Sequence, residues 1–584
     1  MTNSQIADVF ELVADLLEFQ DENPFRVRAY RNGARAIRNL GDSVAAIVQD
    51  DPKRLQQVEG IGKAVAEKCE VLVRTGELPQ LKKLQDEIPE SVLSIMRIPG
   101  MGPKKTAAVY HELGIATLDD LRTACQQGRI QAIKGFGKKT EQTILSGIDL
   151  AAVAEQRIYW ATADEIVEQL RQHLGELTEI QQLEFAGSYR RGRETVGDLD
   201  VLVVASRADQ VMDHFARFSG SPKVMARGDT KMSIRIASGL QIDLRIVPPE
   251  SFGAALQYFT GSKEHNVVLR TRAKQRGLKI NEYGVYRVEG DQEKYVAGQR
   301  EQDVYAALDL PWFPPELREA RHEFAWAETG DLPELIRWED IQGDLHAHTD
   351  ETDGRNSLDE MAEAAQDRGL KYLAITDHSK RVSMAGGLDE RRLLDQWERI
   401  DRWNERASGE FRLLKGIECD ILEKGGLDLP DDVLAQADWV LASIHYGQRQ
   451  PREQITARIL EAIRHPHVSA IAHPTGRLIN QRPPYDVDLD AVFAAARQHG
   501  KLLELNANPM RLDLDDVFCA AAKSHGIPIA INTDAHSVES LDLMRYGILQ
   551  ARRAGLTKAD VANTRTWTEL KKMIGGKQRK KRGK

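Results

Sequence analysis

Cysteine is scarce in this chain: its 584 residues include four cysteines, Cys69, Cys125, Cys419 and Cys519, and no CxxC pair. This spacing argues against a disulfide framework or a thiolate zinc site, and it is typical of a reducing cytosol. No apolar run approaches the roughly 18 to 20 residues that span a bilayer. The N-terminus also lacks the basic and apolar regions of a signal peptide. We therefore expect a cytoplasmic protein without a membrane partner.

A strong net charge is also missing. The formal net charge is −9, with 41% hydrophobic and 29% charged residues, which is typical of a water-soluble globular chain. The lysine- and arginine-bearing loops lie early and acidic residues crowd the later half, so this average does not exclude a nucleic-acid partner, which local basic patches could bind. The length indicates several domains.

The pattern of apolar residues changes along the chain. Residues 1 to about 150 have helical spacing, and short strands such as LDVLVVA and LQIDLRIV follow from about 185 to 300. After three prolines near residue 311, the charged segment ELREARHEFAWAE is predicted to be a helical connector. From about 340, apolar strands alternate with amphipathic helices, which predicts a parallel sheet or barrel.

One internal repeat occurs in the helical region. VEGIGKAVAEK, IPGMGPKKTAAV and IKGFGKKTEQTI each place two glycines, one residue apart, before a helix. Such glycines let the backbone turn tightly, and the amides of the following helix can then bind a phosphate. The repeats resemble helix-hairpin-helix motifs, which hold a nucleic-acid backbone without reading its sequence. The candidate DNA-binding positions are Gly60, Gly62, Gly100, Gly102, Gly135 and Gly137.

The stretch GSYRRGRETVGDLDVLVV sets Asp198 and Asp200 one residue apart in an expected strand, so both carboxylates share one face. Their repulsion is reversed by a divalent cation. LQIDLRIV supplies a third carboxylate, Asp243, and three oxygen donors suit Mg²⁺. A lone DxD would more often lie on the solvent face of an edge strand; the nearby GSYRRG and IDL segments favour a metal site.

GSYRRGRETVGDLD, LQIDLRIV, YFTGSKEHN and GLKINEY together resemble a family X DNA polymerase, over residues 1 to about 315. The resemblance implies that Asp198 and Asp200 hold two Mg²⁺ or Mn²⁺ ions and that Asp243 holds the ion at the primer 3′-hydroxyl. It implies a further set of contacts to the incoming nucleotide: Ser188, Arg191 and Gly197 at the triphosphate, and Tyr258, Phe259, Gly261 and Asn266 at the sugar and the new base pair.

Three positions qualify this resemblance. Gln241 stands where better-known animal members carry an arginine, and Lys263 stands where they carry an aspartate. Both differences bear on rate and base pairing rather than on the chemistry. Lys68 falls at the position of the family's lyase nucleophile, where a lysine forms a Schiff base with an abasic sugar. A nucleophilic lysine must be desolvated, and the sequence does not show whether Lys68 is. The alternative is therefore an ordinary exposed lysine on a helix.

The half beyond residue 340 contains histidines and carboxylates where apolar strands end. Strand ends of an αβ barrel converge on one face, where active sites lie. These donors are His346, His348, Asp353, His378, Glu418, His445, His473, Asp534 and His536. Nine N and O donors exceed the needs of one ion and suit two or three ions of the Mn²⁺, Zn²⁺ or Fe²⁺ type. Histidines that do not follow a strand are left out of the set: His465, His467, His499 and His525.

This donor set resembles that of a PHP domain, a metal-dependent phosphoesterase on a distorted (βα)₇ barrel, and all nine ligand positions are filled. Fused to a polymerase, the resemblance implies a 3′→5′ exonuclease, with cleavage at abasic sites as a further activity. We expect a multidomain chain: helices with helix-hairpin-helix motifs, an α+β nucleotidyltransferase palm and thumb, and the α/β barrel. The expected bounds are 1–80 for the N-terminal lyase-like domain, 81–150 for the hairpin fingers, 151–245 for the palm, 246–315 for the thumb, 316–338 for a linker, 339–575 for the PHP domain and 576–584 for a basic tail.

The function that these patterns favour is gap-filling DNA synthesis in repair. The expected partners are gapped or primer-template DNA, dNTPs and other repair proteins. Two alternatives stay open at this point. The PHP half could hydrolyse a small phosphate ester, because the ligands set the chemistry and not the substrate. The chain could also be a non-catalytic repair scaffold, although the complete donor sets at both sites argue against that.

Overall fold

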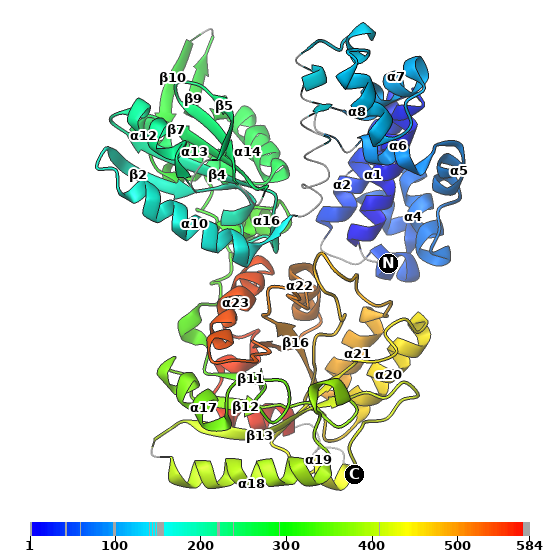
Figure 1. Cartoon of the computed structure of the whole chain (residues 1–584), viewed down its shortest axis with the longest axis vertical. Helices are drawn as coiled ribbons and strands as arrows, with labels where there is room; N and C mark the ends of the chain where they lie inside the picture. Colours follow the sequence, from blue (N-terminus) through cyan, green and yellow to red (C-terminus); the bar gives the residue numbers. More distant parts are fainter. Residues whose placement is uncertain are drawn as a thin grey trace. The chain divides into compact units, whose positions relative to one another are not determined.

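The computed structural model describes residues 3–575 apart from 41–43, 59, 97, 99, 100, 139, 143, 146, 147, 149–156, 219–221, 237, 238, 291 and 408. The chain divides into two compact units. One contains residues 1–157, 219–227 and 233–242, and the other contains residues 158–218, 228–232 and 243–584. Figure 1 shows the helices and strands described below. The basic segment 576–584 lies outside the described residues.

The N-terminal region is helical, as its apolar spacing predicts. In α1, Ile6, Phe10, Val13 and Leu17 are buried on one face. One apolar core joins residues 6–92 and a second joins residues 95–148. The elements are α1 (Asn3–Phe19), α2 (Pro24–Asn39), α3 (Val44–Asp50), η1 (Pro52–Gln57), α4 (Lys63–Thr75), α5 (Pro79–Glu87), α6 (Glu90–Met96), α7 (Pro103–Leu113), α8 (Leu118–Gln126) and η2 (Ile130–Ala132).

The next segment forms a five-stranded sheet with the order β2-β4-β7-β6-β5. Along β4 the buried residues Leu199 and Val201 alternate with the more accessible Asp198 and Asp200, as the strand periodicity predicts. The elements are β1 (Ile158–Tyr159), α10 (Trp160–Gly175), β2 (Ile180–Phe185), α11 (Gly187–Arg190), β3 (Thr195–Val196), β4 (Asp198–Ala205), α12 (Ala208–Phe215), β5 (Lys223–Arg227), β6 (Lys231–Arg235), β7 (Gln241–Ile246) and η4 (Pro249–Ser251).

Helices and a three-stranded antiparallel sheet, ordered β10-β9-β8, follow. The elements are α13 (Phe252–Thr260), α14 (Lys263–Gln275), β8 (Leu278–Asn281), β9 (Gly284–Glu289), β10 (Gln292–Ala297), α15 (Glu301–Ala306), η5 (Pro315–Leu317), α16 (Glu323–Thr329) and η6 (Trp338–Asp340). The prediction of a continuous helix over ELREARHEFAWAE is wrong. Ala320 has φ +56°, and the buried Arg318 bonds to Phe313 and Glu301, so the chain turns before α16 begins.

The C-terminal region forms the predicted parallel barrel. Seven strands pair in chain order from β11 to β17, and a parallel bridge between Ala347 and Ala535 brings the two edges together. The elements are β11 (Gly343–Ala347), α17 (Leu358–Asp367), β12 (Tyr372–Ile375), η7 (Ser383–Ala385), α18 (Glu390–Arg406), β13 (Arg412–Asp420), α19 (Asp431–Leu434), β14 (Trp439–Ser443), α20 (Arg452–Arg464), β15 (Ala470–Ile471), α21 (Leu489–His499), β16 (Leu502–Asn506), α22 (Asp516–Ser524), β17 (Ile529–Asn532), η8 (Glu539–Leu543), α23 (Met544–Arg553), η9 (Ala562–Thr564) and α24 (Trp567–Gly575).

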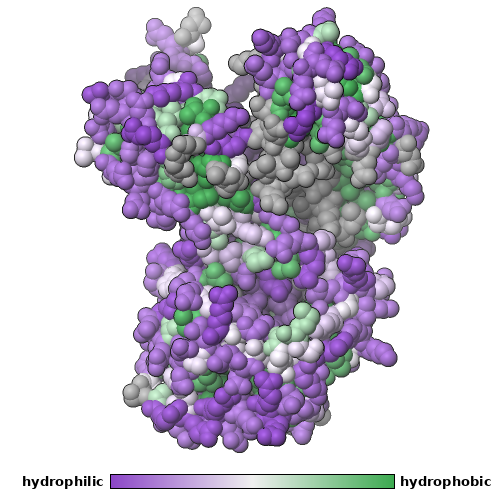
Figure 2. Space-filling view, in the orientation of Figure 1, coloured by the Kyte–Doolittle hydropathy of each residue, from purple (hydrophilic) through white to green (hydrophobic). Residues whose placement is uncertain are grey.

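The surface of the barrel region seen in Figure 2 is largely hydrophilic, with small apolar patches between hydrophilic residues. None of the helices in the described ranges combines the length and the apolar character needed to cross a membrane. All four cysteines are buried and unpaired.

Candidate metal centres

The first centre lies on β4 and β7. Asp198 is exposed, Asp200 is half-buried, and the side chain of Asp243 is 15% exposed. Burial, followed by the nearby charges of Asp198 and Asp243, raises the pKa of Asp200 to about 7. The mutual electrostatic effect of the three carboxylates indicates a site whose repulsion a divalent cation relieves. Lys231 lies near this centre, with its Nζ 3.9 Å from Oδ2 of Asp243.

The glycine-arginine loop lies directly against these carboxylates. Gly187 has φ +67°, and a Cβ at this position would lie 2.7 Å from Oδ2 of Asp200, so only glycine fits. The Oγ of Ser188 is buried and makes no hydrogen bond within the described part of the chain. Gly197 is exposed immediately before Asp198. The loop therefore brings a free hydroxyl and open backbone to the rim of the acidic site.

The two arginines of the loop have protein partners. Arg190 Nη1 donates to Oγ1 of Thr260 at 2.9 Å and to Oε1 of Glu301 at 2.7 Å. Arg191, the predicted triphosphate contact, donates from Nη1 to the carbonyl of Thr260 at 2.8 Å and from Nε to Glu319 at 3.0 Å. These bonds connect the loop to α13 and to the segment before α16.

The four residues predicted at the sugar and base pair lie together at the end of α13. Asn266 donates from Nδ2 to the carbonyls of Tyr258 at 2.7 Å and Gly261 at 3.3 Å. The rings of Tyr258 and Phe259 meet edge to face, with centroids 5.1 Å apart. All four residues are half-buried, so a ligand could contact them.

Two of the predicted hairpin glycines begin helices. Gly62 and Gly102 are the N-cap residues of α4 and α7, and nothing occupies the space where their Cβ would lie. Gly60 and Gly135 have φ of +92° and +91°, and Gly137 also faces open space. The space beside Gly62 and Gly102 is thus open at the two helix starts, where backbone amides can bind a phosphate. Gly100 lies outside the described residues.

Lys68 lies on α4 and is half-buried. Its Nζ donates to the carbonyl of Ala64 at 3.3 Å and lies 5.7 Å from the ring centre of Tyr30. The Schiff-base role of this lysine stays a prediction.

The second centre gathers all nine predicted donors at the carboxyl ends of the barrel strands. Three groups of ligand atoms each lie within 4.8 Å of one another: His348, Asp353, His378 and His536; His346, His348 and Asp534; His378, Glu418 and His445. His473 joins through Nε2, 3.0 Å from Oε1 of Glu418. Because His348 and His378 are each shared by two groups, the donors form one continuous cluster.

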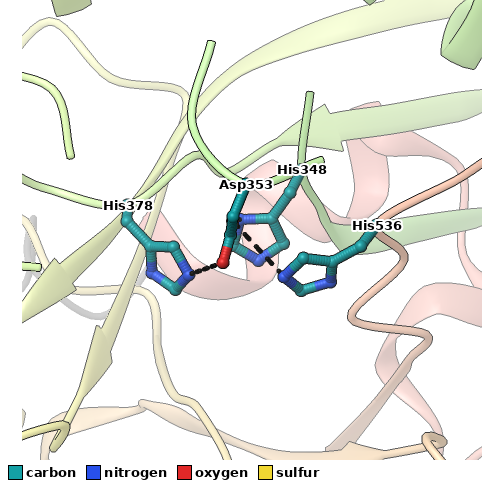
Figure 3. A group of neighbouring side chains, drawn as sticks. All are labelled: His348, Asp353, His378 and His536. Carbon is teal, nitrogen blue, oxygen red and sulfur yellow. Dashed lines mark ion pairs between the residues drawn. The ribbon is translucent and has the colours of Figure 1, made fainter. Parts of the chain in front are cut away.

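Asp353 bridges two histidines of this cluster. Its carboxylate lies between the ring of His378 at 3.5 Å and that of His536 at 3.4 Å (Figure 3). His348 is fully buried behind them, and burial together with the charges of His536 and His378 lowers its pKa to about 3. A neutral imidazole is the form that coordinates a metal.

Several buried nitrogen atoms at this centre form no hydrogen bonds within the part of the chain that the structure describes, which is consistent with a role as metal ligands. Both ring nitrogens of His348, Nε2 of His346 and Nδ1 of His473 lack hydrogen bonds to described residues. Burial would raise the pKa of Glu418, but the charges of His445, His378 and His346 hold it well below its ordinary value. Nε2 of His348 and Nε2 of His346 lie 3.2 and 3.4 Å from Oδ1 of Asp534. Buried nitrogens that face carboxylates without hydrogen bonds to them are the pattern expected of a metal centre.

Sequence reasoning missed the groups that hold these ligands in place. Glu504 of β16 is fully buried; its Oε1 lies 2.7 Å from Nδ1 of His346, and its Oε2 accepts the backbone N–H of His473 at 2.7 Å. Asp420 similarly lies 3.1 Å from Nδ1 of His445. Carboxylates behind metal-binding histidines fix the ring orientation and the tautomer. Their only signal in the sequence is an acidic residue inside an apolar strand.

Another group of donors, His173, Glu176 and His214, lies on α10 and α12. The two imidazole rings stack with centroids 4.0 Å apart, and each Nε2 bonds the carbonyl of the other residue, at 3.0 and 2.8 Å. Arg217 donates to the remaining nitrogen of His214 at 3.4 Å. These contacts satisfy the group without an ion. No metal-ligand group among the described residues includes the four excluded histidines.

Family models match five parts of the chain. The chain matches families described as helix-hairpin-helix domain over residues 1–78, SAM-like helix-hairpin-helix tandem over 92–149, DNA polymerase beta palm over 157–227, DNA polymerase beta thumb over 255–319 and PHP domain over 344–508.

Relatives of two kinds are similar to the chain. A DNA polymerase/3′-5′ exonuclease PolX of Bacillus subtilis is 39% identical over 577 residues, which is 98% of this chain and 99% of the relative. A probable phosphatase of Thermoanaerobacter is 30% identical over 40% of this chain and 98% of its own length. A probable phosphatase of Acetivibrio thermocellus is 31% identical over 33% of this chain and 78% of its own length. The full-length match, together with palm, thumb and PHP domains, shows that the chain belongs to the family X DNA polymerases that carry a C-terminal PHP domain.

Proposed function

We propose that this protein fills short gaps in DNA during repair and that its PHP centre removes nucleotides from a 3′ end. The observation that carries the first half is the juxtaposition of Asp198, Asp200 and Asp243 with the loop that begins at Gly187. The second half rests on the continuous cluster of nine donors. The Bacillus relative, which is named as both polymerase and exonuclease, supports the pairing of the two activities.

At the polymerase centre, Asp198 and Asp200 would hold two Mg²⁺ or Mn²⁺ ions and Asp243 would hold the one at the primer end. Such ions neutralise the charge on the attacking and leaving oxygens of an in-line displacement at the α-phosphate. The chain's own residues position the nucleotide. Ser188, Arg191 and Gly197 would bind the triphosphate, and Asn266 orders the turn after α13.

Tyr258, Phe259 and Gly261 would line the sugar and the minor-groove edge of the new base pair. Their side of α13 is half-buried, so their contact area is available to a planar ligand. The DNA itself would be held through its phosphates by the hairpin glycines, without sequence readout. Lys68 would act as a lyase nucleophile only where it loses its proton, and Lys68→Ala tests this by borohydride trapping on abasic DNA.

At the PHP centre, two or three ions of the Mn²⁺, Zn²⁺ or Fe²⁺ type would be held by the nine donors. Such ions lower the pKa of bound water and provide a hydroxide for phosphodiester hydrolysis. The chain's part is to keep these donors ready: Glu504 and Asp420 orient His346 and His445. Cleavage at abasic sites is a further reaction that this chemistry supports.

A second candidate for the barrel is hydrolysis of a small phosphate ester. The two relatives named probable phosphatases, which match this half of the chain, favour it. Faster turnover of a free phosphomonoester than of single-stranded DNA would support this candidate over the exonuclease. The cytoplasmic location, the domain bounds and the binding of other repair proteins remain predictions from the sequence.

The deciding experiment follows a labelled primer in a one-nucleotide-gapped duplex with Mn²⁺, with and without dNTPs. The wild type is compared with Asp198→Ala/Asp200→Ala and with His346→Ala/His348→Ala. We expect extension to be lost only in the aspartate variant and shortening to be lost only in the histidine variant. Shortening by the histidine variant would refute the nuclease assignment, and a wild type that does not extend the primer would refute the polymerase assignment.

A further inference from the structure

A helix of the PHP barrel forms one wall of the polymerase's triphosphate loop. The loop runs from Gly187 to Arg193, and Gly192 lies against Leu549 of α23. A Cβ on Gly192 would lie 2.5 Å from Cγ of Leu549, so the backbone of the loop packs directly against the side chain of Leu549. Because Gly192 and Leu549 are in close contact, a displacement of α23 would also displace the loop.

The end of α23 holds the loop through one arginine. Arg553, whose side chain is 2% exposed, donates from Nη1 to the carbonyl of Arg191 at 2.7 Å. The same Nη1 lies 3.0 Å from Oε1 of Glu319, and Nη2 donates to Asp516 at 2.7 Å. Glu319 in turn accepts a hydrogen bond from the side chain of Arg191 at 3.0 Å. Arg553 thus fixes Arg191 twice, once at its carbonyl and once through the shared carboxylate.

Arg553 belongs to a buried group of charges in which each carboxylate is shared by more than one arginine. Burial would raise the pKa of Glu319, but the charges of Arg553, Arg191 and Arg193 lower it to about 2. Asp516 also pairs with Arg321 at 2.9 Å. Removing one partner of a buried pair leaves its neighbours uncompensated. Loss of the Arg553 charge would therefore leave Glu319 to Arg191, which already bonds it at 3.0 Å, and to Arg193 at 3.9 Å, so the balance of charge at Arg191 would change.

Other contacts of the same loop do not involve Arg553. Tyr189 stacks on Trp160 with centroids 5.0 Å apart, and Trp160 meets Tyr546 of α23 edge to face at 5.7 Å. Glu194, which directly follows the loop, pairs with Arg477 of the barrel at 2.8 Å. These contacts keep the loop folded in variants at Arg553, so the effect of that residue can be measured separately.

We propose that Arg553, although it belongs to the PHP barrel, is a positioning residue for nucleotidyl transfer: it sets the geometry of the triphosphate loop through the Arg191 carbonyl and Glu319. This inference rests on the proposed polymerase function, in which Arg191 binds the triphosphate. It makes the barrel a structural part of the polymerase site in addition to carrying its own metal centre.

The test compares single-nucleotide incorporation by the full-length wild type, Arg553→Gln and Arg552→Gln. Arg552 is the matched control, because it is the adjacent arginine of α23 and bonds Glu316 and the carbonyl of Ile336 instead of the loop. We expect Arg553→Gln to lower kcat/KM for the dNTP by about 10- to 100-fold, mainly through a higher KM, since small misplacements of binding groups have effects of this size. Arg552→Gln should stay within about threefold of the wild type.

Primer shortening without dNTPs reports the integrity of the barrel in the same preparations. Shortening at the wild-type rate together with a raised KM for the dNTP supports the inference, and equal kinetics of the two variants would overturn it. If Arg553→Gln loses both activities, Arg553→Lys decides, because it keeps the buried charge but not the two-nitrogen geometry. Restored shortening with KM still raised supports the inference; restoration of both or of neither overturns it. A wild type without incorporation would overturn the polymerase function itself.

Discussion

The substitution Glu301→Gln tests how much the buried carboxylate of Glu301 stabilises helix α15 through its contacts with Arg190 and Arg318. Glu301 is 5% exposed and accepts hydrogen bonds from Arg190 at 2.7 Å, from Arg318 and from Nε1 of Trp312 at 3.2 Å. Burial would raise its pKa, but the charges of Arg318 and Arg190 lower it from 4.5 to about 2. Glutamine keeps the shape and removes the charge.

The magnitude follows from that pKa difference. A decrease from 4.5 to about 2 corresponds to about 3 kcal/mol of stabilisation of the charged form, which agrees with about 3 to 5 kcal/mol for breaking a buried ion pair. Because the folded-state pKa is depressed, this stabilisation is complete above pH 4.5 and is lost as the pH falls through about 2. At neutral pH the substitution should therefore have its full effect.

Hydrogen exchange followed by mass spectrometry measures this locally, which suits a chain of several domains. We expect peptides covering α15 to exchange roughly 100-fold faster in Glu301→Gln than in the wild type. The control is Asp303→Asn in the same helix, which removes a pair with Arg300 whose side chain is 71% exposed. That variant should change exchange by less than about fivefold. Equal exchange rates in the two variants would refute the reasoning.

Two further predictions concern metal binding. Glu504→Gln should weaken Mn²⁺ binding at the barrel by about 10- to 100-fold in a metal titration, because Glu504 orients His346. The control is Glu390→Gln, because Glu390 pairs with Lys380 instead of a donor histidine; equal affinities of the two variants would contradict this role. In the metal-free protein, Asp200 keeps a proton below its pKa of about 7, so the apparent Mg²⁺ affinity should rise about tenfold per pH unit from 5 to 7 and then level off. Calorimetry in two buffers measures the released proton, and a pH-independent affinity over that range would contradict the shift. Since this pKa is raised from 3.8 to about 7, the metal-free fold should lose stability as the pH rises between these values.

Features encoded within a few consecutive residues were predictable from the sequence. The alternation around Asp198 and Asp200 places both carboxylates on one face of β4, because a strand has a period of two. The nine barrel donors follow or end strands whose apolar runs are clear, so their convergence follows from the parallel topology.

Features that depend on distant partners were not predictable. The turn at Ala320 interrupts the expected helix where Arg318 bonds back to Glu301 and Glu319 bonds Arg553, more than 200 residues later. In the sequence, Glu504 is one acidic residue within an apolar strand, and only its contact with His346 in the structure indicates a role at the metal centre. Arg553 has no motif, and its role depends on residues more than 200 positions earlier. Periodicity carries no information about such pairs.

The two centres differ in how the charge of their carboxylates is compensated when no metal ion is bound. Each holds carboxylates in a rigid setting before any cation binds, which costs free energy because like charges and buried charges are unfavourable. At the first centre the pKa of Asp200 rises, so a proton can take the place of a cation. At the second, burial would lower the pKa of His378, but Glu418 and Asp353 raise it to about 10, so a protonated imidazole balances the carboxylates. Metal binding must therefore displace a proton from oxygen at one centre and from nitrogen at the other. Acid should then weaken both centres, each by protonating its own ligands, so a shared loss of activity at low pH would not by itself indicate that the two sites communicate.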